Sequence, residues 1–242
     1  MEVLNDILGY KNRKIFQDDH YFSFSLDSIM LANFVNIRYR DKNILDLGTG
    51  NAIIPLVLSL RTDKKIVGID IQEKLVSLAK KSIQYNQLEN QIEIINIDMK
   101  KFAQQSDSLF DIIICNPPYF KINEGNTINL SKAKAIARHE LTITLSDVFR
   151  VSKQLLKYHG TFALVHRPER LLEILNLFRE NDIEPKRLQF VYETVDKEST
   201  LVLIEGTKSG NPGLKIENPI ILYEKDGQKT EQYEKLIREA RQ

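Results

Sequence analysis

The hydrophobic positions along the chain fall into two alternating patterns. Short runs rich in Ile, Val and Leu recur, and most are followed by a longer segment whose apolar residues repeat at helical spacing. Runs such as FDIIIC are apolar at almost every position, which is typical of strands buried on both faces. This alternation predicts βαβ units and a mainly parallel sheet. We expect strands at residues 43–47, 65–70, 92–98, 110–116, 160–166, 187–194 and 200–205.

The segments between these strands complete the expected topology. In LSDVFRVSKQLLKYHG, Ser146 is expected to cap a helix and Gly160 to end it. The last two strands are separated only by the short polar stretch DKES, so they are expected to pair as an antiparallel hairpin. The sequence therefore predicts an α/β fold with a doubly wound, seven-stranded, mainly parallel sheet and an antiparallel last strand.

Composition narrows the class of protein. With 242 residues, 42% hydrophobic and 28% charged, the chain reads as an ordinary globular protein without a membrane span or signal peptide. The single cysteine, Cys115, excludes an internal disulfide and fits a cytoplasmic location. The four histidines and this cysteine show no metal-ligand spacing, so we expect no metal. A net charge of only +1 means that any RNA contact must use a local basic patch, such as the one that includes Lys14.

The ends of the first three expected strands carry acidic residues. The first strand runs into Asp46-Leu47-Gly48-Thr49-Gly50, where glycines permit a tight turn against a ligand and the acid suits a cationic amino-acid group. The second ends in Asp70, placed to accept hydrogen bonds from ribose hydroxyls. The third ends in Asp98-Met99, where the carboxylate suits an adenine amino group, with Met99 and Ile71 flanking the ring. Ligands bind at the carboxyl ends of such strands, so these residues predict a nucleoside-containing cofactor.

The fourth strand runs into the most specific motif of the chain, Asn116-Pro117-Pro118-Tyr119. Two prolines stiffen the loop, which then presents carbonyl oxygens, and the Asn116 side chain adds another neutral acceptor. Acceptors converging on an –NH₂ group hold its hydrogens and aim the nitrogen lone pair at an electrophile. Tyr119 or Phe120 can stack on a planar base. Cys115 precedes the motif and is expected to be an inert buried strand residue.

In these motifs the sequence resembles the class I S-adenosylmethionine-dependent methyltransferases, and within them the bacterial tRNA1(Val) adenine-N6-methyltransferases, over roughly residues 10–205. The resemblance implies a Rossmann-like fold, S-adenosylmethionine as cofactor, and the adenine beside the tRNA anticodon as acceptor. It assigns cofactor binding to Asp46, Gly48, Thr49, Gly50, Asp70, Ile71, Asp98, Met99 and Asn116, and catalysis to Asn116, Pro117, Pro118 and Tyr119. Ala52 departs from the family, because many relatives carry a third glycine there.

Two further stretches share this resemblance. The first, Phe22 to Ala32, is similar to a segment that closes over the methionine end of the cofactor, which implies binding roles for Phe24, Asp27 and Ser28. The second follows the NPPY motif, and we expect RNA contacts from Lys14, Tyr119, Phe120, Lys134, Arg138 and His139. From the residues alone, Asp27 equally fits a helix cap, and Arg138 and His139 equally fit an ordinary solvated surface.

The expected organisation is one monomeric domain over residues 1–242, with a closing segment at 1–41, a core at 42–206 and an extension at 207–242. The NPPY motif does not name its acceptor, because adenine, cytosine, guanine and a glutamine side chain all present –NH₂. A methyltransferase acting on glutamine in a release factor is therefore one alternative, although such relatives carry a longer N-terminal substrate domain. A catalytically silent module that binds cofactor or RNA is another.

Overall fold

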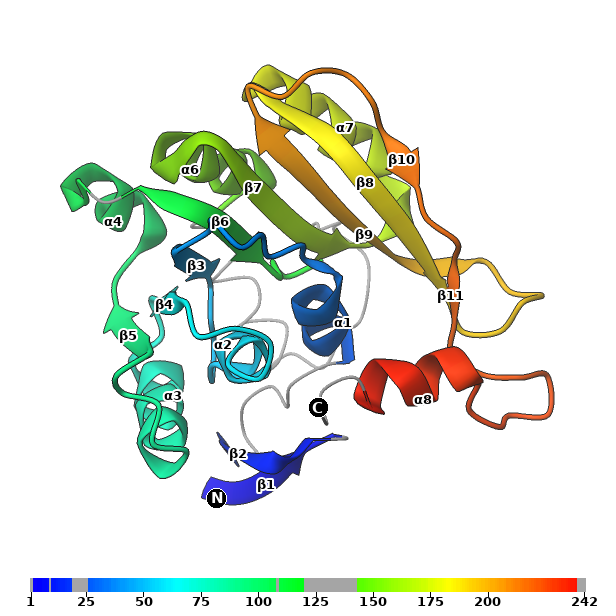
Figure 1. Ribbon diagram of the computed structural model, residues 1–242, viewed down its shortest axis with the longest axis horizontal. Helices are drawn as coiled ribbons and strands as arrows, with labels where there is room; N and C mark the ends of the chain where they lie inside the picture. Colours follow the sequence, from blue (N-terminus) through cyan, green and yellow to red (C-terminus); the bar gives the residue numbers. More distant parts are fainter. Residues whose placement is uncertain (1, 9, 19–25, 108, 120–142, 239–242) are drawn as a thin grey trace, which may run out of the picture.

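The computed structural model describes residues 2–8, 10–18, 26–107, 109–119 and 143–238, and shows a central sheet with helices on both faces (Figure 1). The strands are β1 (Glu2–Ile7), β2 (Tyr10–Asp18), β3 (Asn43–Leu47), β4 (Lys65–Asp70), β5 (Ile92–Asn96), β6 (Phe110–Cys115), β7 (Leu156–His166), β8 (Ile183–Tyr192), β9 (Ser199–Lys208), β10 (Lys215–Ile216) and β11 (Ile220–Ile221). The helices are α1 (Leu26–Phe34), α2 (Ile53–Leu58), α3 (Glu73–Tyr85), α4 (Met99–Gln105), α6 (Leu145–Leu155), α7 (Leu171–Glu180), α8 (Glu231–Arg238) and the 3-10 turn η1 (Pro168–Arg170).

The central sheet has the predicted doubly wound topology. Its strand order is β10-β8-β9-β7-β6-β3-β4-β5, and β11 also pairs with β8. From β7 to β5 neighbouring strands are parallel, whereas β9 runs antiparallel to both β7 and β8. The antiparallel last strand of the predicted seven is thus confirmed. The sheet gains two short edge strands, β10 and β11, each of only two residues, which is too short for a pattern to reveal.

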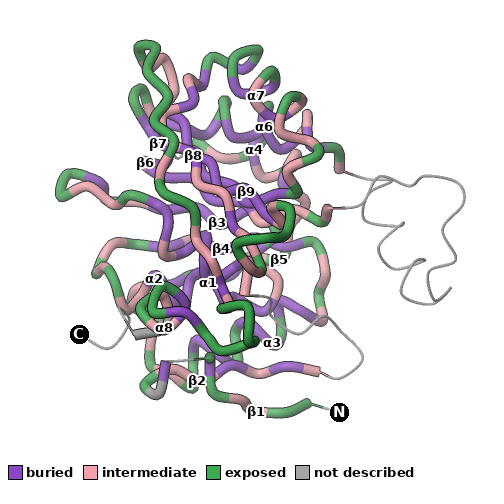
Figure 2. Tube along the Cα trace, turned by 90° about the vertical axis from the view of Figure 1, so that its right-hand side faces the viewer, coloured by how far each residue is buried: buried purple, intermediate pink, exposed green. Residues whose placement is uncertain are grey.

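Alternation along the strands divides the core into two clusters. Ile44 and Ile112 face α1, α2 and α3, whereas Leu45 and Ile113 face α4, α6 and α7. The burial of the central strands is visible in Figure 2. Burial on both faces explains why these strands read as continuous apolar runs.

Two expected boundaries near the fifth strand are wrong. Helix α6 is capped by Thr144 rather than Ser146, because the Thr144 hydroxyl and the Asp147 side chain form a reciprocal capping box. The helix ends at Leu155 instead of Gly160, which lies inside β7. A β-carbon at Gly160 would come within 2.9 Å of the Lys157 carbonyl oxygen, so the glycine serves a close backbone approach rather than a helix end.

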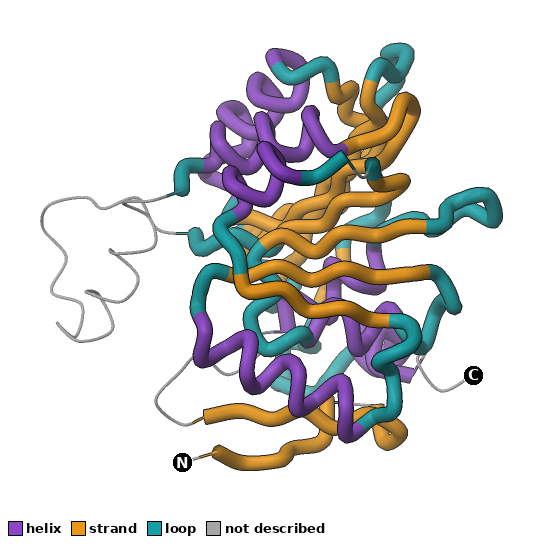
Figure 3. The backbone as a smooth tube through the Cα atoms, turned by 90° about the vertical axis from the view of Figure 1, so that its left-hand side faces the viewer, coloured by secondary structure: helices purple, strands orange, loops and turns teal. Residues whose placement is uncertain are grey.

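The N-terminal segment holds an antiparallel hairpin of β1 and β2 that the apolar pattern does not predict. The hairpin lies against α3, as the side view in Figure 3 shows. Asn86 accepts from the backbone N–H of Lys14 at 3.0 Å and donates to its carbonyl oxygen at 2.7 Å. The Ser82 hydroxyl accepts from the backbone N–H of Phe16 at 2.9 Å. These side-chain contacts, which local periodicity cannot show, fix the hairpin to the core.

Candidate active site

The strand register brings the two principal motifs together. Leu47 of β3 pairs with Cys115 of β6 and with Ile69 of β4. The glycine loop that follows β3 and the NPPY loop that follows β6 therefore leave the sheet side by side at its carboxyl edge. Two neighbouring parallel strands are the reason that residues about 70 positions apart in sequence form one site.

The glycine loop adopts a compact turn. Gly48 and Gly50 have φ angles of +71° and +57°, a region that glycine enters without steric cost. The backbone N–H groups of Gly48 and Thr49 both donate to the Ile69 carbonyl oxygen at 2.9 Å. Ala52 also has a positive φ, +69°, so the missing third glycine is accommodated in the left-handed conformation with its methyl group buried.

Asp46 is the most unusual charged group at this edge. It is fully buried, and neither carboxylate oxygen has a hydrogen-bond partner among the described residues. Burial raises its pKa from 3.8 to about 7, and the charge of Asp70 adds to the rise. The neighbouring Thr49 hydroxyl partly offsets this rise in the pKa of Asp46. This hydroxyl has no hydrogen-bond partner of its own among the described residues. A buried acceptor without a donor marks a place where a cationic or hydrogen-bonding ligand group would be stabilised.

Asp70 braces the glycine loop from the neighbouring strand. Its Oδ2 accepts from the Gly50 backbone N–H at 2.9 Å, and its Oδ1 accepts from the Gln72 N–H at 2.8 Å. Both carboxylate oxygens therefore hold backbone N–H groups at the carboxyl edge of the sheet. Ile71, directly after Asp70, exposes 42% of its surface. An exposed apolar side chain at a strand tip suits contact with a ligand ring.

Asp98 has a local structural function. It lies beyond the end of β5 and caps α4, because its Oδ1 accepts from the backbone N–H groups of Lys100 at 2.9 Å and Lys101 at 3.1 Å. Met99 begins this helix and is buried. The expected strand to residue 98 therefore ends earlier, at Asn96, and the acid starts a helix instead.

The NPPY loop is tied to the start of α1. Asn116 Nδ2 donates to the Ser28 hydroxyl oxygen at 2.8 Å. The Tyr119 hydroxyl lies 2.8 Å from Asp27 Oδ2 and 2.9 Å from Asn116 Oδ1. The start of α1 therefore lies at the candidate site, where Asp27 and Ser28 contact the NPPY residues. The first proline of the motif, Pro117, is partly buried, and Pro118 is exposed.

The Tyr119 ring meets residues that the motif search did not select. It packs edge-on to His166 with centroids 5.2 Å apart, and the Arg167 guanidinium lies over the ring at 5.3 Å. Stacking of Tyr119 on a base would therefore have to use the remaining face. Burial, with the charge of Arg170, lowers the pKa of His166 to about 4, so this imidazole is neutral at pH 7. The sequence feature that could have identified His166 and Arg167 is their position at the end of β7, the fifth parallel strand.

Several expected RNA-contact residues lie outside the described part of the chain. These are Phe120, Lys134, Arg138 and His139, and the expected cofactor residue Phe24 lies outside it as well. Lys14 is described and belongs to β2 of the hairpin, where its Nζ lies 2.6 Å from Asp6 Oδ1. Its hydrogen bond with Asp6 raises its pKa.

The described residues offer little support for a metal site, a cysteine nucleophile or a membrane-spanning helix. They contain no cluster of three or more His, Cys, Asp or Glu residues able to hold a metal ion. The buried Cys115 thiol has a pKa raised well above its usual value by burial, which makes it a poor nucleophile. No helix among the described residues is both long and apolar enough to span a membrane.

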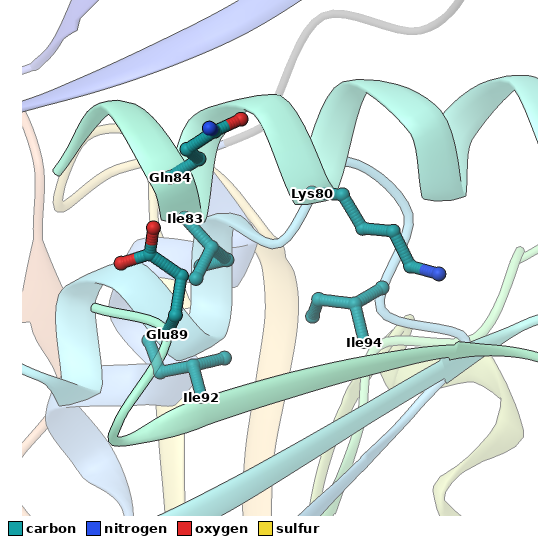
Figure 4. A pocket seen from close by; sticks show the side chains of 6 residues that line it. All are labelled: Lys80, Ile83, Gln84, Glu89, Ile92 and Ile94. Atoms are coloured by element: carbon teal, nitrogen blue, oxygen red, sulfur yellow. The ribbon is translucent and has the colours of Figure 1, made fainter. Parts of the chain in front are cut away.

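A hollow of about 320 Å³ lies between α3 and β5 (Figure 4). Its lining includes Ile83 and Gln84 near the end of α3 and Ile92 at the start of β5. The start of a parallel strand is opposite the edge that carries Asp46 and Asn116. This hollow is therefore separate from the candidate active site.

Comparisons with known proteins show which family the chain belongs to. Residues 39–199 match the family described as "Methyltransferase domain". A tRNA1(Val) (adenine(37)-N6)-methyltransferase from Parabacteroides distasonis is 27% identical over 84% of each chain. One of the same name from Shewanella sediminis is 26% identical over 88% of this chain and 89% of its own. A predicted O-methyltransferase of known structure from Agrobacterium tumefaciens superposes with a TM-score of 0.69 at 18% identity, over 89% of this chain and 96% of that one.

The family match covers β3 to the start of β9, and so includes both the glycine loop and the NPPY loop. The structural likeness independently supports the sheet topology. The chain belongs to the methyltransferase domain family.

Proposed function

We propose that the chain is an S-adenosylmethionine-dependent methyltransferase that methylates N6 of an adenine in tRNA. The observation that carries this proposal is the pairing of Leu47 with Cys115, which sets the neutral NPPY acceptors beside the cofactor loop. The names of the relatives, tRNA1(Val) (adenine(37)-N6)-methyltransferases, support the adenine of tRNA as the acceptor. They favour the anticodon-loop adenine of a tRNA of the valine type.

The described residues fit the cofactor. The unpaired carboxylate of Asp46 suits the ammonium group of its methionine part, and the adjacent Thr49 hydroxyl supplies a further unpaired polar atom. Asp70 is proposed to accept hydrogen bonds from the ribose hydroxyls, and the exposed Ile71 side chain suits one face of the adenine. Asp98 and Met99 complete the proposed set, with Asp98 using its remaining acceptor positions, because its Oδ1 already caps α4. Ser28 is proposed to act at the methionine end.

The chemistry requires positioning more than acid–base catalysis. When bound, the cofactor supplies a methyl group activated by a sulfonium. Asn116 Oδ1 and a carbonyl oxygen of the loop accept the two hydrogens of the target –NH₂, so that the nitrogen lone pair points at this methyl group. The amine nitrogen held by these acceptors would take the methyl group as its bond to sulfur breaks, leaving S-adenosylhomocysteine, and would then lose its surplus proton to water. This reaction needs no metal ion.

The proposed partner is tRNA, whose loop bases are unpaired and are extruded at low cost. Cytoplasmic action follows from that substrate. One chain supplies every described group of the site, so we propose a monomer. Tyr119, Phe120, Lys14, Lys134, Arg138 and His139 are proposed to contact the RNA, and Arg167 joins them because it lies exposed above Tyr119.

The proposal predicts methyl transfer to tRNA that lacks this modification. Purified protein with radiolabelled cofactor is expected to label such tRNA, and digestion to nucleosides is expected to yield N6-methyladenosine. Label on a glutamine of a release factor, with none on tRNA, would favour the protein substrate instead. Calorimetric binding of S-adenosylhomocysteine without transfer to either acceptor would identify a silent module.

A further inference from the structure

The contacts around Asn116 contain a competition for one hydrogen atom. The Tyr119 hydroxyl carries a single hydrogen, yet it lies within hydrogen-bonding distance of two acceptor oxygens. These are Asp27 Oδ2 at 2.8 Å and Asn116 Oδ1 at 2.9 Å. Only one of the two can receive a full hydrogen bond at a time.

The orientation of the Asn116 amide makes this competition consequential. Nδ2 donates to the Ser28 hydroxyl oxygen at 2.8 Å, so Oδ1 is the atom that faces Tyr119. Oδ1 has no other donor among the described residues. It is also the atom that must accept a hydrogen of the target –NH₂ in the proposed reaction. A hydroxyl that donated fully to Oδ1 would occupy the catalytic acceptor.

We infer that Asp27 is a positioning residue that draws the Tyr119 hydroxyl hydrogen away from Asn116, and so keeps Asn116 Oδ1 available for the substrate amine. The inference rests on the proposed function, because it concerns the atom that holds the acceptor nitrogen. A carboxylate is a stronger acceptor than an amide oxygen, since hydrogen bonds to an ionised group are shorter and roughly twice as strong. The hydrogen therefore goes to Asp27.

As a consequence, Asn116 Oδ1 lies beside the Tyr119 hydroxyl oxygen but does not receive its hydrogen. Two oxygens 2.9 Å apart without a hydrogen between them repel each other. An N–H group that donates to Oδ1 relieves this repulsion, so the arrangement favours arrival of the target amine. The pKa of Tyr119 is raised, first by burial and then by the charge of Asp27, so the phenol keeps its hydrogen throughout the working pH range.

This role differs from the cofactor contact that the sequence suggests for Asp27. It also gives the first turn of α1 a part in positioning the acceptor, because Ser28 contacts the Asn116 amide and the preceding residue, Asp27, contacts the Tyr119 hydroxyl. Ser28 fixes which end of the amide faces Tyr119, and Asp27 sets the direction of the hydroxyl hydrogen.

The test is a double-mutant cycle of Asp27→Asn and Tyr119→Phe, assayed by steady-state methylation of unmodified tRNA. Asp27→Asn keeps the size of the side chain and removes its charge, so the hydroxyl turns to Asn116. We expect kcat to fall about tenfold, with the KM for tRNA and the Kd for S-adenosylhomocysteine unchanged. Tyr119→Phe removes the contested hydrogen, so it is expected to remain more active than Asp27→Asn. In the Tyr119→Phe background, Asp27→Asn is expected to have no further effect.

Asp63→Asn is the matched control, because it makes the same chemical change on a side chain that is 93% exposed. Equal loss from Asp27→Asn in both backgrounds would overturn the inference, and so would weaker cofactor binding by Asp27→Asn. Absence of turnover in Tyr119→Phe would overturn it too, since the hydroxyl would then be required. If Asp27→Asn does not fold, Asp27→Ala makes the same comparison.

The wild-type protein separates the two proposals. If it transfers methyl groups to a glutamine peptide and not to tRNA, the proposed substrate fails, and the same cycle is run on the peptide, which also presents –NH₂. If it methylates tRNA and the cycle is additive, the substrate stands and the role of Asp27 fails.

Discussion

At the scale of single residues, the buried Asp46 carboxylate makes the stability of the protein depend on pH. The carboxylate is fully buried without a hydrogen-bond partner among the described residues, and its pKa rises to about 7. The folded state therefore holds this proton more tightly than the unfolded state, where the pKa is near 3.8. The stabilising contribution is fully present below pH 3.8 and is lost as the pH rises to about 7. Above that pH the folded protein contains a buried charge.

Asp46→Asn is expected to stabilise the unliganded protein and to weaken its cofactor binding. At pH 8 we expect the free energy of unfolding to rise by on the order of 2 kcal/mol, because the amide carries no charge to desolvate. At pH 4 the two proteins should be nearly equal. The Kd for S-adenosylhomocysteine at pH 8 should rise about tenfold or more, since the anionic partner is gone. Denaturant titration and calorimetry measure both quantities, and a variant less stable than wild type at pH 8 would contradict this account.

The sequence locates candidate site residues along the chain, but it does not show which of them contact one another. Asp46 and Asn116 could be located because each ends a recognisable apolar run. The hydrogen bonds of Asn116 to Ser28 and of Tyr119 to Asp27 could not, because they join residues about 90 positions apart through the packing of α1. Asp98 shows a second limit of the sequence. An acid after a strand fits a ligand contact and a helix cap equally well, and only the structure shows that Asp98 caps α4.

At the scale of elements, the glycine loop depends on a glycine inside the neighbouring strand β4. Gly68 lies in β4 beside this loop. A β-carbon there would come within 2.7 Å of the Thr49 Oγ1 and 2.9 Å of Ile94 Cδ1. The Thr49 backbone is held by its hydrogen bond to Ile69, so the loop has little room to retreat. Gly68 thus lets the glycine loop lie close against the sheet.

Gly68→Ala is expected to cost about 1–3 kcal/mol of stability through overpacking. It should also weaken cofactor binding, because relief of the clash displaces Thr49 within the loop. The combination with Thr49→Ala removes the closest clashing atom, so it should recover part of the lost stability while leaving binding impaired. Thermal unfolding and calorimetry follow the two effects. Full stability of Gly68→Ala, with unchanged binding, would show that the loop is not held at this distance.

Element positions were largely predictable, and their ends were not. The seven principal strands and the final hairpin follow from apolar runs and one short polar turn. The start of α6 was misplaced because Ser146 and Thr144 are both good caps, and only Thr144 has Asp147 three residues later for a reciprocal bond. Gly160 was misread because a glycine required for close backbone approach looks like a helix end.

At the scale of the whole molecule, the active site joins the N-terminal part of the chain to the sheet. The hairpin lies on α3 through Asn86 and Ser82, and α1 follows it and contacts the NPPY loop. Such docking depends on tertiary contacts, which the sequence alone does not show, and a closing role for the N-terminal segment stays a prediction. The assignment of residues 1–242 to a single domain stays a prediction, as does the division at residues 41 and 206.

The most direct test of the account concerns the Asn116 side-chain oxygen as the acceptor that grips the target amine. Asn116→Ala is compared with the control Asn90→Ala, which truncates an exposed asparagine away from the site. Single-turnover methylation of unmodified tRNA and calorimetry with S-adenosylhomocysteine are measured on both. We predict that Asn116→Ala loses methyl transfer by at least about 100-fold while its Kd stays within about threefold of wild type. Transfer at the rate of the Asn90→Ala control would contradict the central claim.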